Sequence, residues 1–179
     1  MSATSSPLVG RAGECEAIAG ALRALRARAG AVVAFEGEPG IGKSLLLAHL
    51  AAMATADGCT VLRSRATEFE ADLPYALWTE ALDAHLADAG ERRLSRLGVS
   101  DPVALGAVLP ALIAHEPAAA DRHGTHRALR DLLERLAATR PLVLCLDDVH
   151  WADPASVDAL AALVHRAPRA PVLLAMAAR

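Results

Sequence analysis

A glycine-rich segment in the first third of the chain holds its only lysine. Lys43 is the one lysine among 18 lysine and arginine residues. It lies in Gly37-Glu38-Pro39-Gly40-Ile41-Gly42-Lys43-Ser44, a complete G-x-x-x-x-G-K-S pattern. A compact ammonium on a flexible stem can reach between two phosphate groups, where a planar guanidinium is too broad. The use of lysine at this one position therefore indicates phosphate binding.

The backbone and the last residue of this segment suit a phosphate and a metal ion. Gly37, Gly40 and Gly42 permit tight turns, and no Cβ then separates the backbone N–H groups from an anion. Together with the first turn of a following helix, these donors form a concave positive site for the β- and γ-phosphates of a nucleotide. Ser44 offers its hydroxyl to a Mg²⁺ ion that bridges those phosphates.

The flanking residues distinguish this segment from an ordinary Gly/Pro-rich surface turn, which could carry the same letters by chance. Residues 31–35 predict a buried strand before the segment, and residues 44–53 predict a helix after it. The helix has Leu46, Leu50 and Met53 at i, i+4 and i+7. A strand, a glycine-rich turn and a helix in this order favour a nucleotide phosphate loop.

Two adjacent acids supply the second half of the candidate site. Residues 142–146 form a continuous apolar run that ends in Asp147-Asp148, as in a parallel strand that presents acids at its carboxyl end. We assign Asp147 to Mg²⁺, through water, and Asp148 to orienting or deprotonating the attacking water. Alone, such a run is more often a strand leaving the core. The phosphate loop at Lys43 favours the catalytic interpretation.

Composition bounds the class of protein. A chain of 179 residues with 54% apolar content suits one domain with a sizeable core. The net charge of −3 provides no general basic field, so we expect no direct nucleic-acid binding. Three widely separated cysteines fit a reducing compartment. No leader or membrane-length apolar stretch is visible, so we expect a cytoplasmic protein without a membrane contact.

The order of elements predicts an α/β fold. Strands are expected near residues 31–36, 60–65, 141–147 and 171–177, and the helices between them include 14–29 and 43–56. A further helix is expected to start at Pro154, with Asp153 as its N-cap. Alternating strands and helices, with phosphate and metal groups at strand ends, predict a three-layer fold around a parallel sheet. The sequence contains no asparagine, so the N-K-x-D guanine-reading box is absent and adenine is favoured.

Several motifs in order make the chain similar to the AAA-type P-loop ATPase module of STAND signalling ATPases. The nearest resemblance is to the module at the N-terminus of large LuxR-type transcriptional regulators. The motifs are Leu8-Val9-Gly10-Arg11-x-x-Glu14, the loop at 37–44, Leu73-Pro74-Tyr75, the segment from Asp147 to Ser156, and the closing strand to Arg179.

This resemblance implies an ATP/ADP-binding regulatory switch with slow or no hydrolysis. It places Gly10 and Arg11 beside the adenine and gives the loop from Gly37 to Ser44 to phosphates and Mg²⁺. Asp147 and Asp148 become the Walker B acids, and Arg179 matches a strand-end arginine that senses the γ-phosphate. Many relatives have glutamate where Asp148 stands, and the shorter arm argues against efficient hydrolysis.

The resemblance also implies a sheet order of 5-1-4-3-2 with a helical lid. Because four strands are expected here, we interpret residues 1–179 as one ATPase core truncated before the fifth strand and the lid. Residues 1–7 would be disordered, and 75–138 would be a helical insertion between the second and third strands. Strand 31–36 would then be an open apolar edge, which favours self-association. Whether the chain is a natural short protein or a fragment stays open.

Two other functions remain open. A P-loop phosphotransferase would share the loop, but the sequence shows no arginine-bearing lid and no acceptor pocket. A helical interaction module without nucleotide would account for residues 75–138 alone. His123-x-x-His126 has no further ligand spaced with it and predicts a solvated helix start rather than a metal site. Trp151 is expected to pack at the strand–helix corner rather than to touch a ligand.

Overall fold

The computed structural model describes residues 10–87, 97–110 and 121–179. The segment expected to be disordered, 1–7, lies outside these residues, as do Leu8 and Val9 of the first motif.

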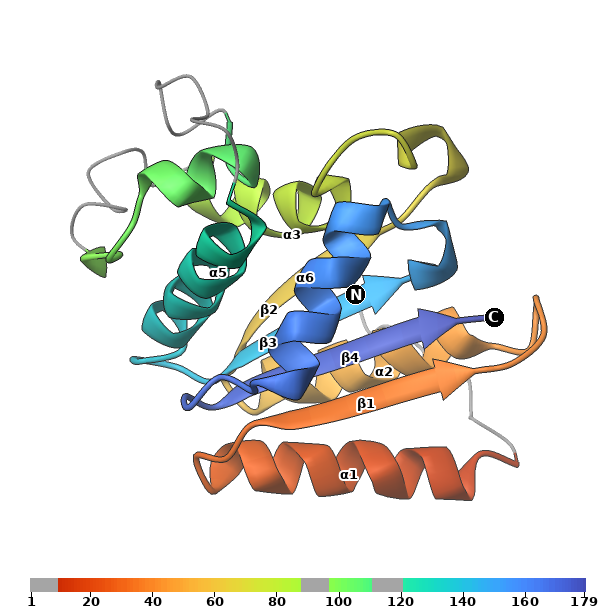
Figure 1. Cartoon of the computed structure of the whole chain (residues 1–179). Coiled ribbons are helices and arrows are strands. Elements are labelled where there is room, and N and C mark those ends of the chain that lie inside the picture. Colours follow the sequence, from red (N-terminus) through yellow and green to blue (C-terminus); the bar gives the residue numbers. More distant parts are fainter. Residues whose placement is uncertain (1–9, 88–96, 111–120) are drawn as a thin grey trace.

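Four parallel strands form one sheet at the centre of the molecule (Figure 1). They are β1 (Ala31–Glu36), β2 (Thr60–Arg65), β3 (Leu142–Asp147) and β4 (Val172–Ala178), in the order β1-β4-β3-β2. Chain order and sheet order differ, so the connections cross over the sheet faces, as helices in an α/β fold do. This confirms the predicted three-layer architecture.

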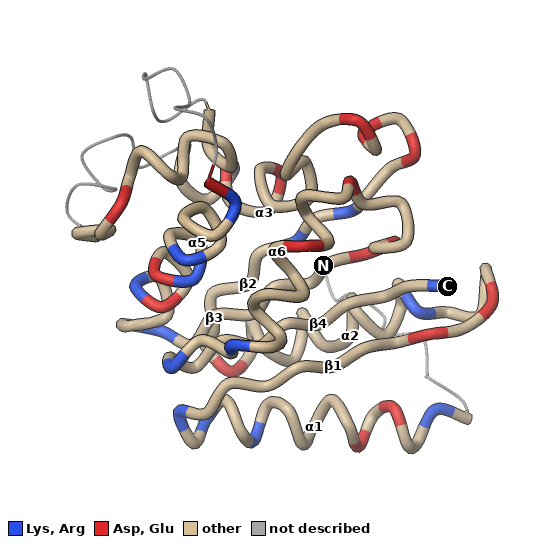
Figure 2. The backbone as a smooth tube through the Cα atoms, in the orientation of Figure 1, with Lys and Arg blue, Asp and Glu red and all other residues tan. Residues whose placement is uncertain are grey.

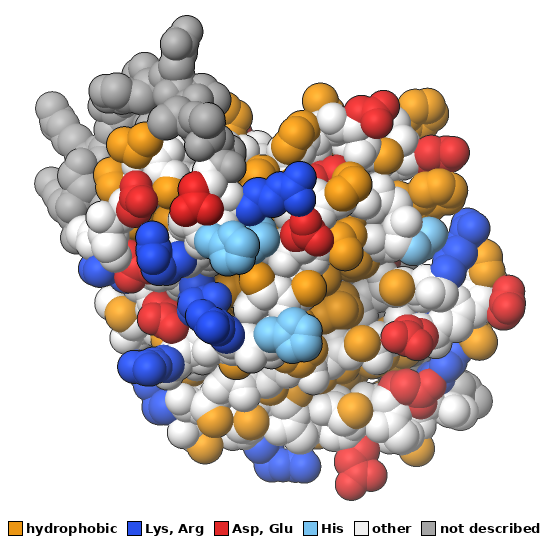
Figure 3. All heavy atoms as spheres, viewed as in Figure 1, with side chains coloured by type: hydrophobic (Ala, Val, Ile, Leu, Met, Phe, Trp, Pro, Cys, Tyr) orange, Lys and Arg blue, Asp and Glu red, His pale blue; other side chains and the backbone are white. Residues whose placement is uncertain are grey.

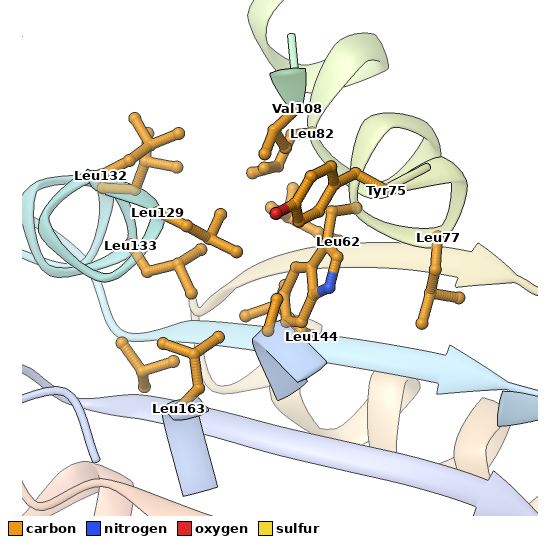
Figure 4. Close-up of a cluster of buried hydrophobic side chains, with 14 of the residues drawn as sticks. Leu62, Tyr75, Leu77, Leu82, Val108, Leu129, Leu132, Leu133, Leu144 and Leu163 are labelled. Atoms are coloured by element: carbon orange, nitrogen blue, oxygen red, sulfur yellow. The ribbon is translucent and has the colours of Figure 1, made fainter. Parts of the chain in front are cut away.

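Each face of the sheet is covered by its own helices. The helices α1 (Ala12–Arg26) and α2 (Lys43–Ala56) pack on one face, where Leu22, Leu50 and Leu173 belong to one buried cluster. The opposite face carries α3 (Ala76–Ala87), α5 (Arg122–Leu136) and α6 (Pro154–His165). Figure 4 shows Leu62 and Leu144 of the sheet facing Tyr75 and Leu129 in this second cluster. Three short helices lie in the connections: η1 (Glu68–Glu70), η2 (Val103–Ala107) and η3 (Val149–Trp151).

Strand burial follows position in the sheet. Five of the six residues of β3 are buried, as its apolar run predicts for a central strand. In β1, by contrast, exposed and half-buried residues alternate, and Phe35 is the only buried one. Among the described residues β1 pairs with β4 alone, so it lies at the edge of the sheet. The prediction of a buried strand is therefore wrong for most residues of β1. Its edge position agrees with the expected strand order.

Helix boundaries differ little from the expected ones. Helix α2 has the expected bounds of 43–56, but α1 ends at Arg26 instead of reaching 29. The reason is local, since Arg28 has a left-handed backbone with φ of 63°. Helix α6 begins as expected at Pro154, and Asp153 caps it by accepting a hydrogen bond from Ser156 N at 2.9 Å. Within the described part of the chain, no helix is both long and apolar enough to span a membrane.

Candidate phosphate-binding site

The glycine-rich loop joins the carboxyl end of β1 to the first turn of α2. Gly42 is the N-cap of α2 with φ of 95°, and its carbonyl accepts from Leu46 N at 3.1 Å. A Cβ built on Gly40 or Gly42 would meet nothing within 4 Å. Glycine is therefore required at these positions by the backbone conformation, not by lack of space.

Lys43 is tied to its own loop. Its Nζ donates to the carbonyl oxygens of Gly37 at 2.7 Å and Glu38 at 2.9 Å, and the residue is only 8% exposed. An ammonium group has three N–H donors, so this arrangement leaves one for a further acceptor. The two carbonyls fix the position of the charge at the start of α2, where the helix dipole also favours an anion.

A hollow of about 430 Å³, which we call the larger hollow, opens beside this loop. Its walls come from the loop, the ends of β2, β3 and β4, and η3. The lining residues are Pro39, Gly40, Gly42, Lys43, Ser44, Arg65, Asp148, Trp151 and Arg179. The structure thus brings together, at the carboxyl edge of the sheet, residues that are far apart in the sequence, as expected for a ligand site in an open parallel sheet.

The two acids at the end of β3 have different surroundings. Asp147 ends the strand, and its Oδ1 accepts from the backbone N–H of Asp148 at 2.9 Å. Asp148 has a left-handed backbone with φ of 51°, which turns the chain away from the strand direction. Its Oδ2 accepts from Arg65 Nε at 2.9 Å and from Arg65 Nη2 at 2.7 Å.

Arg65 is a site residue that the sequence analysis missed. The hydrogen bonds to Asp148 hold the pKa of its guanidinium above the ordinary value for arginine. Arg65 is the last residue of β2, the strand next to β3, and its backbone N–H donates to Glu80 at 2.8 Å. Carboxyl ends of neighbouring parallel strands meet at one edge, so that position was the available signal.

A second hollow adjoins the first. It has a volume of about 250 Å³ and lies between α2 and the ends of β2 and β3. Ser44 and Arg65 line both hollows, and Asp147, Arg63 and Glu80 line the second one. Cys145 and Leu47 supply part of its apolar wall.

The oxygen donors fit a magnesium ion. The Ser44 hydroxyl and the Asp147 carboxylate line the same hollow, and both are hard ligands of the kind Mg²⁺ prefers. Among the described residues, no group of three or more histidine, cysteine or acidic side chains could hold a metal ion. Mg²⁺ at nucleotide sites needs only one or two protein ligands, because phosphates and waters complete its shell.

The remaining predicted residues lie around the loop. Arg11 donates to the carbonyl oxygen of Ile41 and to Glu14 Oε1, so it connects the start of α1 to the phosphate loop. Gly10 precedes it with φ of 78°.

The guanidinium of Arg179 lies 5.5 Å from the centre of the Trp151 ring, in cation–π contact. Trp151 lines the larger hollow and also packs against the buried cluster on the α6 side of the sheet.

Comparisons with known proteins agree with this fold. A family model described as an AAA ATPase domain matches residues 7–175. The chain therefore belongs to the AAA ATPase domain family, and its fold and loop define a P-loop ATPase module.

Two known proteins show the extent of the similarity. An uncharacterized protein of Rhizobium meliloti (strain 1021) is 32% identical over 190 residues, which cover 97% of this chain and 18% of that protein. The structure of the ORC2 protein of Aeropyrum pernix, in ADPNP–ADP complexes, matches with a TM-score of 0.51 and 20% identity. That match covers 96% of this chain and 41% of the ORC2 chain. This chain thus spans less than half of either protein.

Proposed function

We propose that residues 1–179 form the ATP/ADP-binding core of a STAND-type regulator, of the kind found in large LuxR-type transcriptional regulators. The observation that carries this proposal is the hollow where Lys43, Ser44, Asp148 and Arg179 converge. Membership of the AAA ATPase family and the ADPNP and ADP bound by the ORC2 protein support adenine nucleotides as ligands.

Each group has a distinct task in this proposal. The loop N–H groups and the free donor of Lys43 bind the β- and γ-phosphates. Ser44 and Asp147 would hold Mg²⁺, which neutralises phosphate charge when it is bound. Asp148 orients or deprotonates the attacking water. Arg179, at the end of β4, contacts the γ-phosphate and so distinguishes ATP from ADP.

Slow hydrolysis follows from the surroundings of Asp148. The side chain of Asp148 is shorter than that of a glutamate, and its Oδ2 already accepts two hydrogen bonds from Arg65. These bonds hold the carboxylate on Arg65, so Asp148 can take its place beside the attacking water only when the pair opens. The bound nucleotide would therefore persist, which suits a switch more than a high-turnover enzyme.

Substitution of each acid tests this division of roles. Asp147→Asn should weaken Mg²⁺-dependent ATP affinity, because it removes charge from the metal ligand. Asp148→Asn should retain ATP and lower whatever turnover exists. Calorimetry with Mg·ATP and a phosphate-release assay would measure both effects. Equal loss of ATP affinity in the two variants would contradict the assignment.

One observation favours phosphotransfer as a second candidate function. The hollow of about 250 Å³ adjoins Ser44 and Asp147 and includes Arg63, so it has the place and charge of an acceptor pocket. Transfer of the ATP γ-phosphate to a small anionic acceptor, followed by ³¹P NMR, would support this alternative. An Arg63→Gln variant should then lose transfer while retaining ATP. Hydrolysis to free phosphate as the only reaction would favour the switch.

A further inference from the structure

The solvent-facing side of α6 carries a stripe of four apolar side chains beside the exposed Asp158 and His165. Pro154, Val157, Ala161 and Val164 are all exposed, and their spacing places them in one stripe on the helix. Val157 and Val164 are each 43% exposed. The stripe spans about 15 Å at 1.5 Å per residue. Figure 3 shows orange apolar side chains over the middle of this face, where Figure 1 places α6, with acidic and histidine side chains beside them.

An acidic loop with an exposed aromatic ring lies at the N-terminal end of this stripe. We call residues 67–74 the acidic loop, because it holds Glu68, Glu70 and Asp72 and no basic residue (Figure 2). Phe69 is 96% exposed in a protein whose other phenylalanine, Phe35, is 6% exposed. Leu73 of the same loop is 56% exposed, so the loop presents two large apolar side chains to water.

The acidic loop is held firmly against the start of α6. Tyr75 N donates to Asp153 Oδ1 at 2.9 Å, and Asp153 is the N-cap of α6. Within the loop, Thr67 Oγ1 donates to Glu70 at 2.7 Å, and Leu73 N donates to the carbonyl of Glu70 at 2.9 Å. The exposed ring is thus presented on an ordered segment, which lowers the entropy lost when it binds.

Basic side chains lie at the other end of the stripe. Arg166 and Arg169 follow the C-terminus of α6, and both are exposed. In the part of the chain that the structure describes, neither guanidinium makes a hydrogen bond or ion pair, and the same holds for the carboxylates of Glu68 and Asp72. The face therefore has free acids at one end and free bases at the other. The apolar stripe lies between them, beside Asp158, which pairs with Arg122 of α5 at 3.4 Å.

We propose that this face binds the same face of a second copy of the chain, with the two α6 helices antiparallel about a two-fold axis. The apolar stripes would pack together, and the small side chain of Ala161 near their centre allows close approach. Each acidic loop would then lie opposite Arg166 and Arg169 of the other copy. One surface supplies both complementary charges, as a self-complementary two-fold contact requires. This contact needs no nucleotide and is separate from the β1 edge.

Sedimentation velocity from micromolar to near-millimolar concentration tests the contact. We expect a reversible monomer–dimer equilibrium that weakens as salt is added. Ala161→Glu should weaken the dimer by about tenfold or more, because it places like charges together near the axis. Ala52→Glu, the same substitution at an exposed position of α2, is the matched control and should leave the dimer unchanged. Circular dichroism would verify the fold of each variant.

A charge exchange tests the pairing itself. The variant with Glu68→Arg and Asp72→Arg should dimerise poorly, as should the variant with Arg166→Glu and Arg169→Glu. An equimolar mixture of the two variants should dimerise again, since each reversed end then meets its opposite.

Three results would overturn the proposal. They are a monomer at every concentration, equal behaviour of Ala161→Glu and Ala52→Glu, and a mixture of the charge variants that stays monomeric. Loss of dimer in Val32→Lys, with Ala161→Glu unaffected, would instead assign self-association to the β1 edge, where Val32 is 44% exposed.

Discussion

At the scale of single residues, Lys43 carries the assignment of the phosphate site. Its ammonium lies between two loop carbonyls at 2.7 and 2.9 Å, in a position that is 8% exposed. A guanidinium is broader and cannot occupy the same place without moving the loop. The structure therefore gives a steric reason for the only lysine in the chain.

We expect Lys43→Ala to weaken Mg·ATP binding by about a hundredfold or more, because it removes a charge-assisted contact to phosphate. Lys43→Arg should restore little of that affinity although it keeps the charge. Isothermal titration calorimetry would measure both variants. An arginine variant that binds ATP as tightly as the wild type would show that the steric explanation is wrong.

Arg65 restrains Asp148 by two hydrogen bonds to one carboxylate oxygen. We expect Arg65→Gln to raise the rate of ATP hydrolysis by about fivefold, since the open form of Asp148 becomes more populated. Arg63→Gln is the matched control, because Arg63 lies on the same strand and lines the smaller hollow without contacting Asp148. A steady-state phosphate-release assay compares them. An unchanged or lower rate in Arg65→Gln would show that the pair does not limit hydrolysis.

At the scale of elements, Asp153 joins two segments. Its Oδ1 accepts from Ser156 N, which caps α6, and from Tyr75 N, which anchors the acidic loop, and Asp153 is only 2% exposed. We expect Asp153→Ala to lower the free energy of unfolding by about 2 to 4 kcal/mol. Asp121→Ala removes an exposed cap of α5 with one such bond and should cost about 1 kcal/mol. Urea denaturation measures both, and equal losses would contradict the double role of Asp153.

The sequence predicted elements whose signals are local. The bounds of α2 and the start of α6 follow from adjacent residues, namely the phosphate loop and the Asp153-Pro154 cap. The apolar run of β1 predicted its burial wrongly, because such a run cannot show that its strand lies at an edge; the edge position came from the strand order that the resemblance implied. The Arg65–Asp148 pair was missed because its members are 83 residues apart and meet only when β2 lies beside β3.

At the scale of the whole molecule, stability should depend on pH through Cys145. Burial raises the pKa of this thiol to about 11, from 9.0 in an ordinary environment. The unfolded chain therefore loses the proton first as pH rises. The buried neutral thiol contributes about 3 kcal/mol to the free energy of unfolding below about pH 9. This contribution is lost as the pH rises towards about 11.

Urea unfolding from about pH 8 to about pH 10.5 measures this dependence. We expect the free energy of unfolding of the wild type to fall more steeply than that of Cys145→Ala, in which this group cannot titrate. Parallel slopes for the two proteins would show that Cys145 does not account for the alkaline loss of stability.

The central claim is that the carboxyl edge of this sheet binds adenine nucleotides through the loop at Lys43. Equilibrium titration of the purified chain with ATP and with ADP, each with Mg²⁺, tests it most directly. We predict saturable one-to-one binding of both nucleotides, loss of that binding in Lys43→Ala, and no comparable binding of GTP. Absence of binding by the folded wild-type protein, or equal binding by Lys43→Ala, would contradict the account.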